Sequence, residues 1–410
     1  MSPQLPLHLM PERRLLPIFA HAVKNRKSTM DSAAPRTPAP HAPRLTELAW
    51  IFFKIGCLGF GGQLVVLSMI REALVVKRGW LAQERFTEGA SLAQLLPGPT
   101  MVQMATYVGR ELRGLRGVLV CPTALIAPAL ACVLVVGTAY RVSGSVPAVN
   151  AVFDLVGPAA IAMLSAAALQ LARASLKDWL DGLALACSFV GVALLHWQPA
   201  TVLVGIGLIG MLARRTIVAS IALPLLLFAD TPRAGSFLDF TTLFFRTGAL
   251  AFGGGQVVIP LLQHDVVEKF HWLSAQQFLD GVALGQLTPG PIMITATFIG
   301  LLAFGYAGAA VATLGAFVPG LVYMLIARRT LSRWKDNPWV RDFLKAIFAA
   351  AIGAVFGSAV LLGQLELHTP LQFAALGVAL IAAIFFKQSA GRIFVVAGVA
   401  GAVRYFLHVE

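Results

Sequence analysis

Residues 52–67 read FFKIGCLGFGGQLVVL, and residues 244–260 read FFRTGALAFGGGQVVIP. Each stretch is apolar apart from one early cation, Lys54 in the first and Arg246 in the second, and each is interrupted by consecutive glycines. The two cations fall on each other at an offset of 192 residues. Because glycine permits backbone conformations that other residues avoid, both stretches are predicted to break in the middle. The glycines at the two breaks are Gly61, Gly62, Gly253 and Gly254.

A second pair of matching segments follows at the same offset. Residues 94–99 read QLLPGP and residues 286–291 read QLTPGP. Proline ends a preceding helix and is tolerated in the first turn of a new one, so each PGP predicts a further broken helix. The polar and glycine positions of these segments are Gln94, Gly98, Gln286 and Gly290. The chain is therefore predicted to be a duplicated unit, with one copy at 45–229, the other at 237–410, and a basic, disordered arm at 1–44.

Composition places this duplicated unit in a membrane. Of the 410 residues, 58% are hydrophobic and only 12% are charged. Soluble domains carry about 25% charged residues, so the composition argues against a soluble enzyme, and the many long apolar runs predict an all-α polytopic membrane protein in a lipid bilayer. The net charge of +13 is spread along the chain, which argues against nucleic-acid binding and favours loops that face the cytoplasm.

The distribution of Lys and Arg predicts that the two copies are inverted. In the first copy the loops around the broken segments are rich in Lys and Arg, whereas the matching loops of the second copy hold Lys269 alone. If the broken segments are re-entrant hairpins and the later runs cross the bilayer, the cytoplasmic loops carry 18 Lys and Arg against four outside. This topology keeps the N-terminus cytoplasmic. It requires two short crossings within 199–229.

Inverted repeats with interrupted helices are typical of secondary transporters, whose site lies near the midplane. A half-helix that starts at a break presents free N–H groups and the positive end of its dipole, which together suit an anion. Lys54 and Arg246 are predicted to neutralise that anion, and Gln94 and Gln286 to donate hydrogen bonds to it. The alternatives are that the breaks are only kinks in packed helices, and that the two cations extend to the membrane surface.

Three carboxylates are candidates for proton coupling. Glu88 and its repeat copy Asp280 lie two to three helical turns before PGP, and Asp154 is a lone acid in an apolar run. Acids within membrane segments commonly mark proton relays. Glu88 and Asp280 could equally be helix-start residues of their hairpins. No cluster of His, Cys or acids predicts a metal site or a catalytic centre, and no motif predicts a bound cofactor.

At these residues the chain resembles the chromate ion transporter family in its long, two-domain form. The resemblance rests on FxKIGxxxFGG at 52–62, FxRTGxxxFGGG at 244–255 and the two QLxPGP segments. It implies a bacterial inner-membrane protein that exports chromate with the proton motive force and confers chromate resistance, with sulfate as a competitor. Gln63 stands where the second copy has Gly255, so the half-sites are unequal.

Other functions stay open on the sequence alone. Chromate and sulfate are both tetrahedral dianions, so a transporter of sulfate or of another oxyanion is one alternative. A passive anion channel of the same architecture is another. A membrane enzyme is disfavoured, because no acid–base constellation is present. A homodimer is one form of assembly that the sequence leaves open.

Overall fold

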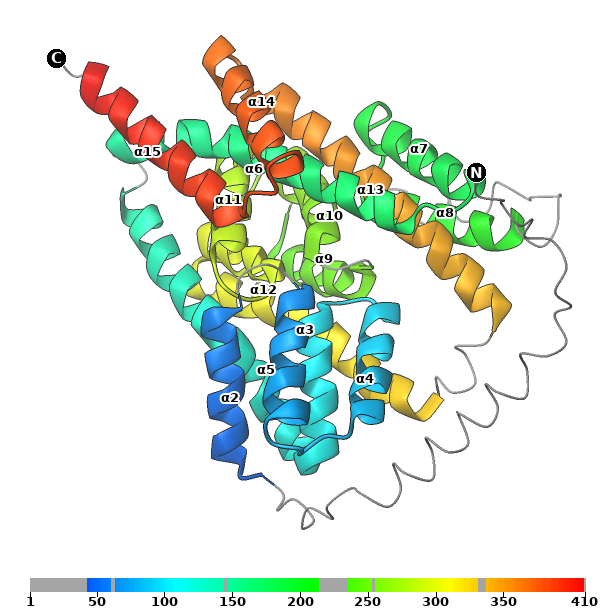
Figure 1. Cartoon of the computed structure of the whole chain (residues 1–410). Coiled ribbons are helices and arrows are strands. Elements are labelled where there is room, and N and C mark those ends of the chain that lie inside the picture. Colours follow the sequence, from blue (N-terminus) through cyan, green and yellow to red (C-terminus); the bar gives the residue numbers. More distant parts are fainter. Residues whose placement is uncertain are drawn as a thin grey trace, which may run out of the picture. The chain divides into compact units, whose positions relative to one another are not determined.

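In the computed structural model the repeat is visible in the order of the helices. The structure describes residues 43–59, 63–143, 147–213, 235–252, 255–330 and 337–408. Every regular element within these ranges is a helix, as predicted for an all-α membrane protein (Figure 1). The predicted arm, apart from its last two residues, lies outside the described ranges, and so does the predicted crossing at 217–229.

Helices of the two halves begin at matching positions. The offset is 192 residues from α4 to α11 and 191 residues from α6 to α13, so the duplication extends through the whole unit. The first half contains α2 (Leu45–Leu58), α3 (Gln63–Arg71), the π-helical η2 (Glu72–Val76), α4 (Gln83–Leu95), α5 (Thr100–Ser143), α6 (Pro147–Ser175), α7 (Trp179–Ala193) and α8 (Pro199–Ala213). The second contains α9 (Phe237–Leu250), the 3₁₀ turn η3 (Gly255–Val257), α10 (Val258–Gln263), the π-helical η4 (His264–Lys269), α11 (Ala275–Leu287), the 3₁₀ turn η5 (Ile292–Ile294), α12 (Thr295–Thr330), α13 (Pro338–Glu366), α14 (Pro370–Ile384) and α15 (Ala390–His408).

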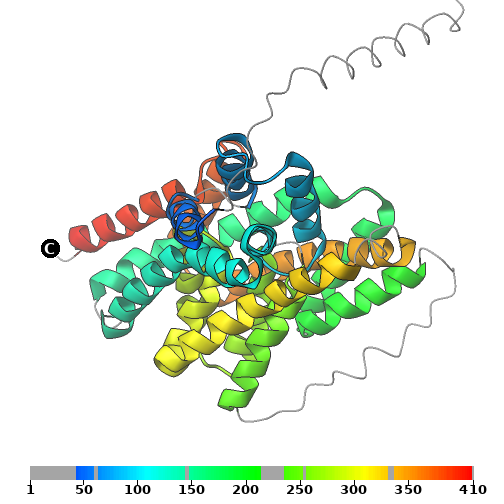
Figure 2. The same ribbon diagram turned by 90° about the horizontal axis from the view of Figure 1, so that it is seen from below.

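The broken segments fold back as hairpins. A Cβ atom on Gly89 of α4 would lie 2.4 Å from the ring of Tyr107 in α5, so these two helices run side by side on either side of the PGP break. Gly281 of α11 meets Phe298 of α12 in the same way. In Figure 1 the helices α2, α3 and α4 lie next to one another, and Figure 2 shows α2 (blue) nearly end-on. The predicted re-entrant geometry therefore agrees with the helix packing.

A glycine contact lets α5 and α12 reverse direction. In α5 the helix is interrupted at Arg113 (φ −142°) and Gly114 (φ 60°). A Cβ on Gly109 would lie only 2.2 Å from the carbonyl oxygen of Gly117, so the chain turns back sharply there. The corresponding residues of the second half are Phe304 and Gly305 at the interruption and Gly300 and Gly308 at the contact.

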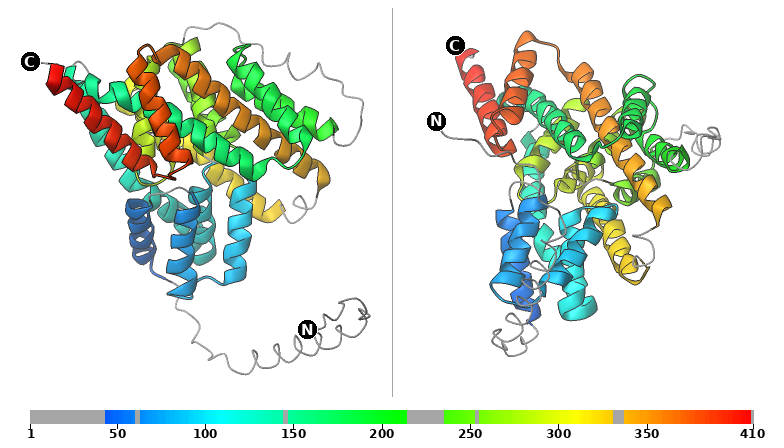
Figure 3. Two further views of the ribbon diagram at one scale, coloured as in Figure 1. Left: turned by 45° about the horizontal axis from the view of Figure 1, so that its top comes forward. Right: turned by 45° about the vertical axis from the view of Figure 1, so that its right-hand side comes forward.

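Two shorter helices of each half pack on one long helix of the other half, and they do so reciprocally. Helix α7 packs on α13 while its repeat copy α14 packs on α6, and α8 packs on α13 while its copy α15 packs on α6 (Figure 3). Glycines bring these helices together: Gly353 of α13 faces the Leu185 carbonyl oxygen of α7, and Gly401 of α15 faces that of Ala151 in α6. Small residues at helix crossings give the close van der Waals contact on which association in lipid depends.

Five of the described helices are long and apolar enough to cross a membrane. They are Thr100–Val142, Ala151–Ser175, Ile292–Ala327, Pro338–Glu366 and Ala390–Leu407. Two of the five, in α5 and α12, contain the reversals described above, so each extends less far in space than its number of residues indicates. The remaining apolar helices α7, α8 and α14 are shorter than a full span.

Candidate functional site

The four helix breaks meet at one place. The backbone N–H of Gly98, in the first PGP, donates to the carbonyl oxygen of Ala251 at 2.9 Å. The repeat copy of this bond runs from the N–H of Gly290 to the carbonyl oxygen of Gly59 at 3.4 Å. Each PGP break thus contacts the glycine break of the other half. Non-helical backbone is tolerated at membrane depth only where protein or water satisfies it, and here each half does this for the other.

Glycine is required at the two PGP breaks. Gly98 has φ of +121° and Gly290 has φ of +114°, conformations that side-chain-bearing residues rarely adopt. A Cβ on Gly98 would also come within 2.9 Å of Nε2 of Gln103. The other predicted glycines of the site, Gly61, Gly62, Gly253 and Gly254, lie outside the described residues.

A cavity of about 270 Å³ opens between these breaks. Residues of both halves line it, among them Gln63, Thr100 and Gln170 from the first and Gln256 and Gly290 from the second. Within the described part of its lining no side chain is charged, and the polar groups are amides and one hydroxyl. A water molecule occupies about 30 Å³ in the liquid, so the cavity has room for a small, partly hydrated ion.

The cavity is lined by the starts of two half-helices. Helix α3 begins at Gln63 and α5 begins at Thr100, and both residues lie on its wall. The first N–H groups of a helix have no partner within it, and the helix dipole favours negative charge there. Oε1 of Gln256 is buried without a hydrogen-bond partner, and an amide can present its NH₂ group by turning over. The cavity can therefore offer several donors to an oxyanion.

A second cavity of about 330 Å³ adjoins the first. The two share Gln63, Thr100 and Leu171, and the second one extends past Gln94 of α4 to Ser175 at the end of α6. Gln94 is exposed in it, whereas its repeat copy Gln286 is half-buried with Nε2 unpaired. The two predicted glutamines thus have unequal surroundings, and the first half provides a path to the central cavity.

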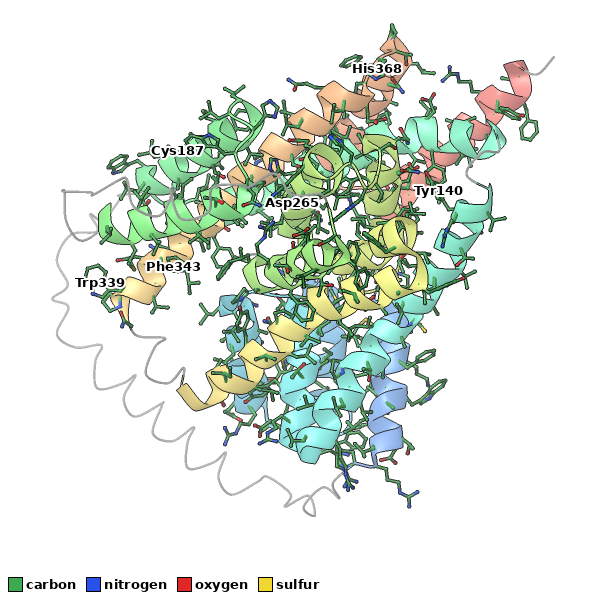
Figure 4. All side chains as sticks on the ribbon, turned by 180° about the vertical axis from the view of Figure 1, so that it is seen from behind. Tyr140, Cys187, Asp265, Trp339, Phe343 and His368 are labelled. Atoms are coloured by element: carbon green, nitrogen blue, oxygen red, sulfur yellow. The ribbon has the colours of Figure 1, made fainter. Side chains whose placement is uncertain are left out.

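The two predicted cations do not line the central cavity. Lys54 is exposed on α2, with Nζ 4.9 Å from the centre of the Trp50 ring. Arg246 forms an ion pair with Asp265, which is only 1% exposed and is labelled in Figure 4. Asp265 already compensates the charge of Arg246. Both placements differ from the arrangement expected from the sequence, because Lys54 lies on an exposed face of α2 and because Arg246 is paired with a buried acid. The acid has alanine, Ala73, at its repeat position, so Lys54 has no such partner there.

The three candidate carboxylates have different environments. Asp280 is 2% exposed and accepts hydrogen bonds from the Tyr140 hydroxyl at 2.6 Å and from Nε2 of Gln276 at 2.8 Å. Its repeat copy Glu88 is exposed and lies 3.1 Å from Arg85. Asp154 forms an ion pair with Arg404 at 2.6 Å. Among the acids predicted from the sequence, only Asp280 is both buried and bonded to neutral donors in the described part of the chain.

Two residues of the site were not predicted. Gln170 lies on the cavity wall, and Tyr140, labelled in Figure 4, reaches from the first half to Asp280 of the second. The signal for Gln170 was a polar side chain in the apolar run of α6. Duplication gives no support to it, because the repeat position of Gln170 is Leu361. Tyr140 sits at the end of an apolar run and has no signal of its own.

These features define a multi-pass membrane protein in which broken helices of two repeats enclose a shared polar cavity, the architecture of a membrane transporter. A family model described as chromate transporter matches the chain twice, over residues 46–211 and 238–403. The chain therefore belongs to the chromate transporter family, as the resemblance implied.

Relatives of known description match along most of the chain. A probable chromate transport protein of Synechococcus elongatus is 33% identical over 374 residues, which cover 88% of this chain and 95% of the relative. A chromate transport protein of Cupriavidus metallidurans is 30% identical, with 88% and 93% covered. One of Pseudomonas aeruginosa is 26% identical, with 85% and 90% covered. No solved structure matches the chain.

Proposed function

We propose that this protein exports chromate across the bacterial inner membrane as a secondary active transporter. The observation that carries the proposal is the cavity at the meeting point of the four breaks, whose described lining offers neutral donors and helix starts and no acidic side chain. Such a lining suits a dianion and repels no negative charge. The relatives named as chromate transport proteins support chromate as the ion. Sulfate has the same shape and charge and is expected to compete.

Alternating access would follow from opposite orientations of the two repeats. The excess of Lys and Arg in the loops of the first hairpins supports a cytoplasmic position for those loops and for the N-terminus. In that orientation the path past Gln94 and Ser175 leads to the cytoplasm, so this conformation loads chromate from inside. The reciprocal packing of α7 on α13 and of α14 on α6 supports a second conformation in which the repeats exchange roles.

Asp280 is the proposed proton carrier. A carboxylate buried without a cationic partner is costly when ionised, so its charge would depend on access to water. Protonation from the outer side and release to the cytoplasm would let proton entry drive chromate exit. Asp154 and Glu88 suit this role less well, because each has an arginine close by.

Vesicles test transport and its energy source together. Everted membrane vesicles containing the protein are expected to accumulate radiolabelled chromate when respiration acidifies their lumen. An uncoupler is expected to reduce this accumulation to the level of vesicles without the protein, and excess sulfate to reduce it in part. Accumulation that survives collapse of the pH gradient alone, by nigericin in potassium buffer, and is lost when the membrane potential is collapsed would indicate a passive channel instead. Uptake of sulfate that chromate does not compete with would assign a different oxyanion.

A further inference from the structure

Lys54 does not line the proposed transport cavity. It lines a separate, positively charged groove. This groove of about 670 Å³ runs between α2 and the α3–η2 segment. We call it the basic groove, defined by its four cations, which are Lys54, Arg71, Lys77 and Arg78. Its one acidic lining residue is Glu72, which lies 3.5 Å from Lys77. The groove therefore carries a clear excess of positive charge.

Neutral groups hold three of these cations in place. Nζ of Lys54 lies over the Trp50 ring, and Nε of Arg71 donates to Oε1 of Gln83 at 2.8 Å. Nη1 of Arg78 donates to the carbonyl oxygen of Ala73 at 3.1 Å. Within the described ranges none of the three forms an ion pair with a carboxylate. The side chains are therefore positioned, while their charge stays uncompensated.

Apolar residues line the groove beside its cations. They are Ile51, Ile55 and Leu58 of α2 and Met69 of α3. Ile51 and Ile55 are buried in the core, whereas Leu58 is 64% exposed and the neighbouring Trp50 is 57% exposed, so the apolar surface that is open to the surroundings lies at Leu58. Tryptophan at such a position is typical of the interface between lipid tails and headgroups. A basic end beside an apolar wall matches a molecule with an anionic head and a hydrocarbon tail.

The second repeat does not reproduce this combination. Its counterpart of Lys54 is Arg246, which is paired with Asp265. Gln263 and Phe270 stand at the repeat positions of Arg71 and Arg78. The basic groove thus belongs to the repeat whose hairpin loops carry the excess of Lys and Arg. In the predicted topology that end faces the cytoplasmic leaflet, where anionic lipids give the surface a negative potential.

We propose that the basic groove binds an anionic phospholipid. The phosphate lies among Lys54, Arg71 and Arg78, and an acyl chain lies along Leu58 and Met69. A free inorganic oxyanion would use the cations but would gain nothing from the apolar wall, whereas each buried methylene of a lipid tail contributes. The lipid would contact both α2 and α3, and α3 begins at Gln63 on the wall of the central cavity, so it would link the membrane to the proposed transport site.

Native mass spectrometry of the full, delipidated protein tests this assignment. Dioleoylphosphatidylglycerol and dioleoylphosphatidylcholine are added in equal amounts, and bound lipid is counted. The wild type is expected to prefer phosphatidylglycerol about 25-fold, and each cation removed should reduce that preference about fivefold. The variant Arg71→Gln/Arg78→Gln should therefore bind the two lipids almost equally. The single variant Lys54→Gln should reduce the preference for phosphatidylglycerol about fivefold.

A matched control separates the groove from general surface charge. Arg110→Gln/Arg116→Gln removes two cations from the neighbouring loop, outside the groove lining, and should keep the wild-type preference. Size-exclusion profiles check that every variant stays folded. Equal loss in the control, an unchanged preference in the groove variant, or displacement of the lipid by millimolar inorganic phosphate would each overturn the proposal. The last result would assign the cations to a water-soluble oxyanion.

Discussion

Asp280→Asn is expected to abolish proton-driven accumulation of chromate in everted vesicles, down to the level of vesicles without the protein. Asparagine keeps the shape of the side chain and an oxygen that accepts from Tyr140 or Gln276, but it cannot bind and release a proton. Exchange of unlabelled for labelled chromate across the same vesicles needs no net proton movement. It should continue at a rate close to that of the wild type.

Glu88→Gln is the matched control, since Glu88 is the repeat copy of Asp280. Its carboxylate is exposed and lies beside Arg85, so its loss should change accumulation by less than about twofold, as for most exposed ion pairs. If Asp280→Asn still accumulates chromate in an uncoupler-sensitive way, Asp280 is not the proton carrier. If Glu88→Gln is the variant that fails, the coupling site lies in the first repeat.

Gly98→Ala is expected to lower chromate transport at least about tenfold while the protein remains in the membrane. At φ of +121° an alanine is strained by about 1–3 kcal/mol. Its Cβ would also lie 2.9 Å from Nε2 of Gln103 and 3.0 Å from Cα of Gly320. The break must move to relieve this contact, which disturbs the bond from the Gly98 N–H to Ala251 and the start of α5 at the cavity.

Two other glycines calibrate this effect. Gly290→Ala has similar strain at φ of +114°, but among the described residues its Cβ would meet only Cβ of Ala129, at 3.5 Å. Gly205→Ala in α8 would meet no atom of the described ranges within 4 Å and has no unusual φ. Transport rates should therefore rank Gly205→Ala above Gly290→Ala above Gly98→Ala, with membrane levels measured on the same samples. If the Gly98→Ala protein transports chromate as fast as the Gly205→Ala protein, the backbone conformation of Gly98 is not needed for transport.

The repeat, the helical fold and the position of the breaks could be predicted from the sequence. The breaks were predictable because glycine and proline act locally on the backbone, and duplication doubled each signal. The position of Lys54 was not predictable in the same way. A cation in an apolar run indicates function or the membrane surface, but which of the two applies depends on what the helix α2 packs against, and this is a tertiary property.

The candidate site shows the same limit. Gln94, Gln286 and both PGP glycines were predicted because each has a copy. Gln170 and Tyr140 act singly, and Arg246 is neutralised by Asp265, whose repeat position is Ala73. Contacts between the halves, such as Tyr140 with Asp280, join residues 140 positions apart and leave no periodic pattern. The sequence shows that the two repeats differ, as at Gln63 and Gly255, but the contacts that follow from such differences are visible only in the structure.

The most direct test of a shared oxyanion site is the position of chromium itself. Crystals of the protein are grown with chromate, and diffraction is measured above and below the chromium absorption edge. A peak in the anomalous difference map that disappears below the edge identifies chromium and gives its position. The strongest peak is expected in the central cavity, within hydrogen-bond reach of Thr100 and the amides of Gln63 and Gln256. A peak beside Lys54 in the basic groove or at Arg246, with no density in the cavity, would contradict the account.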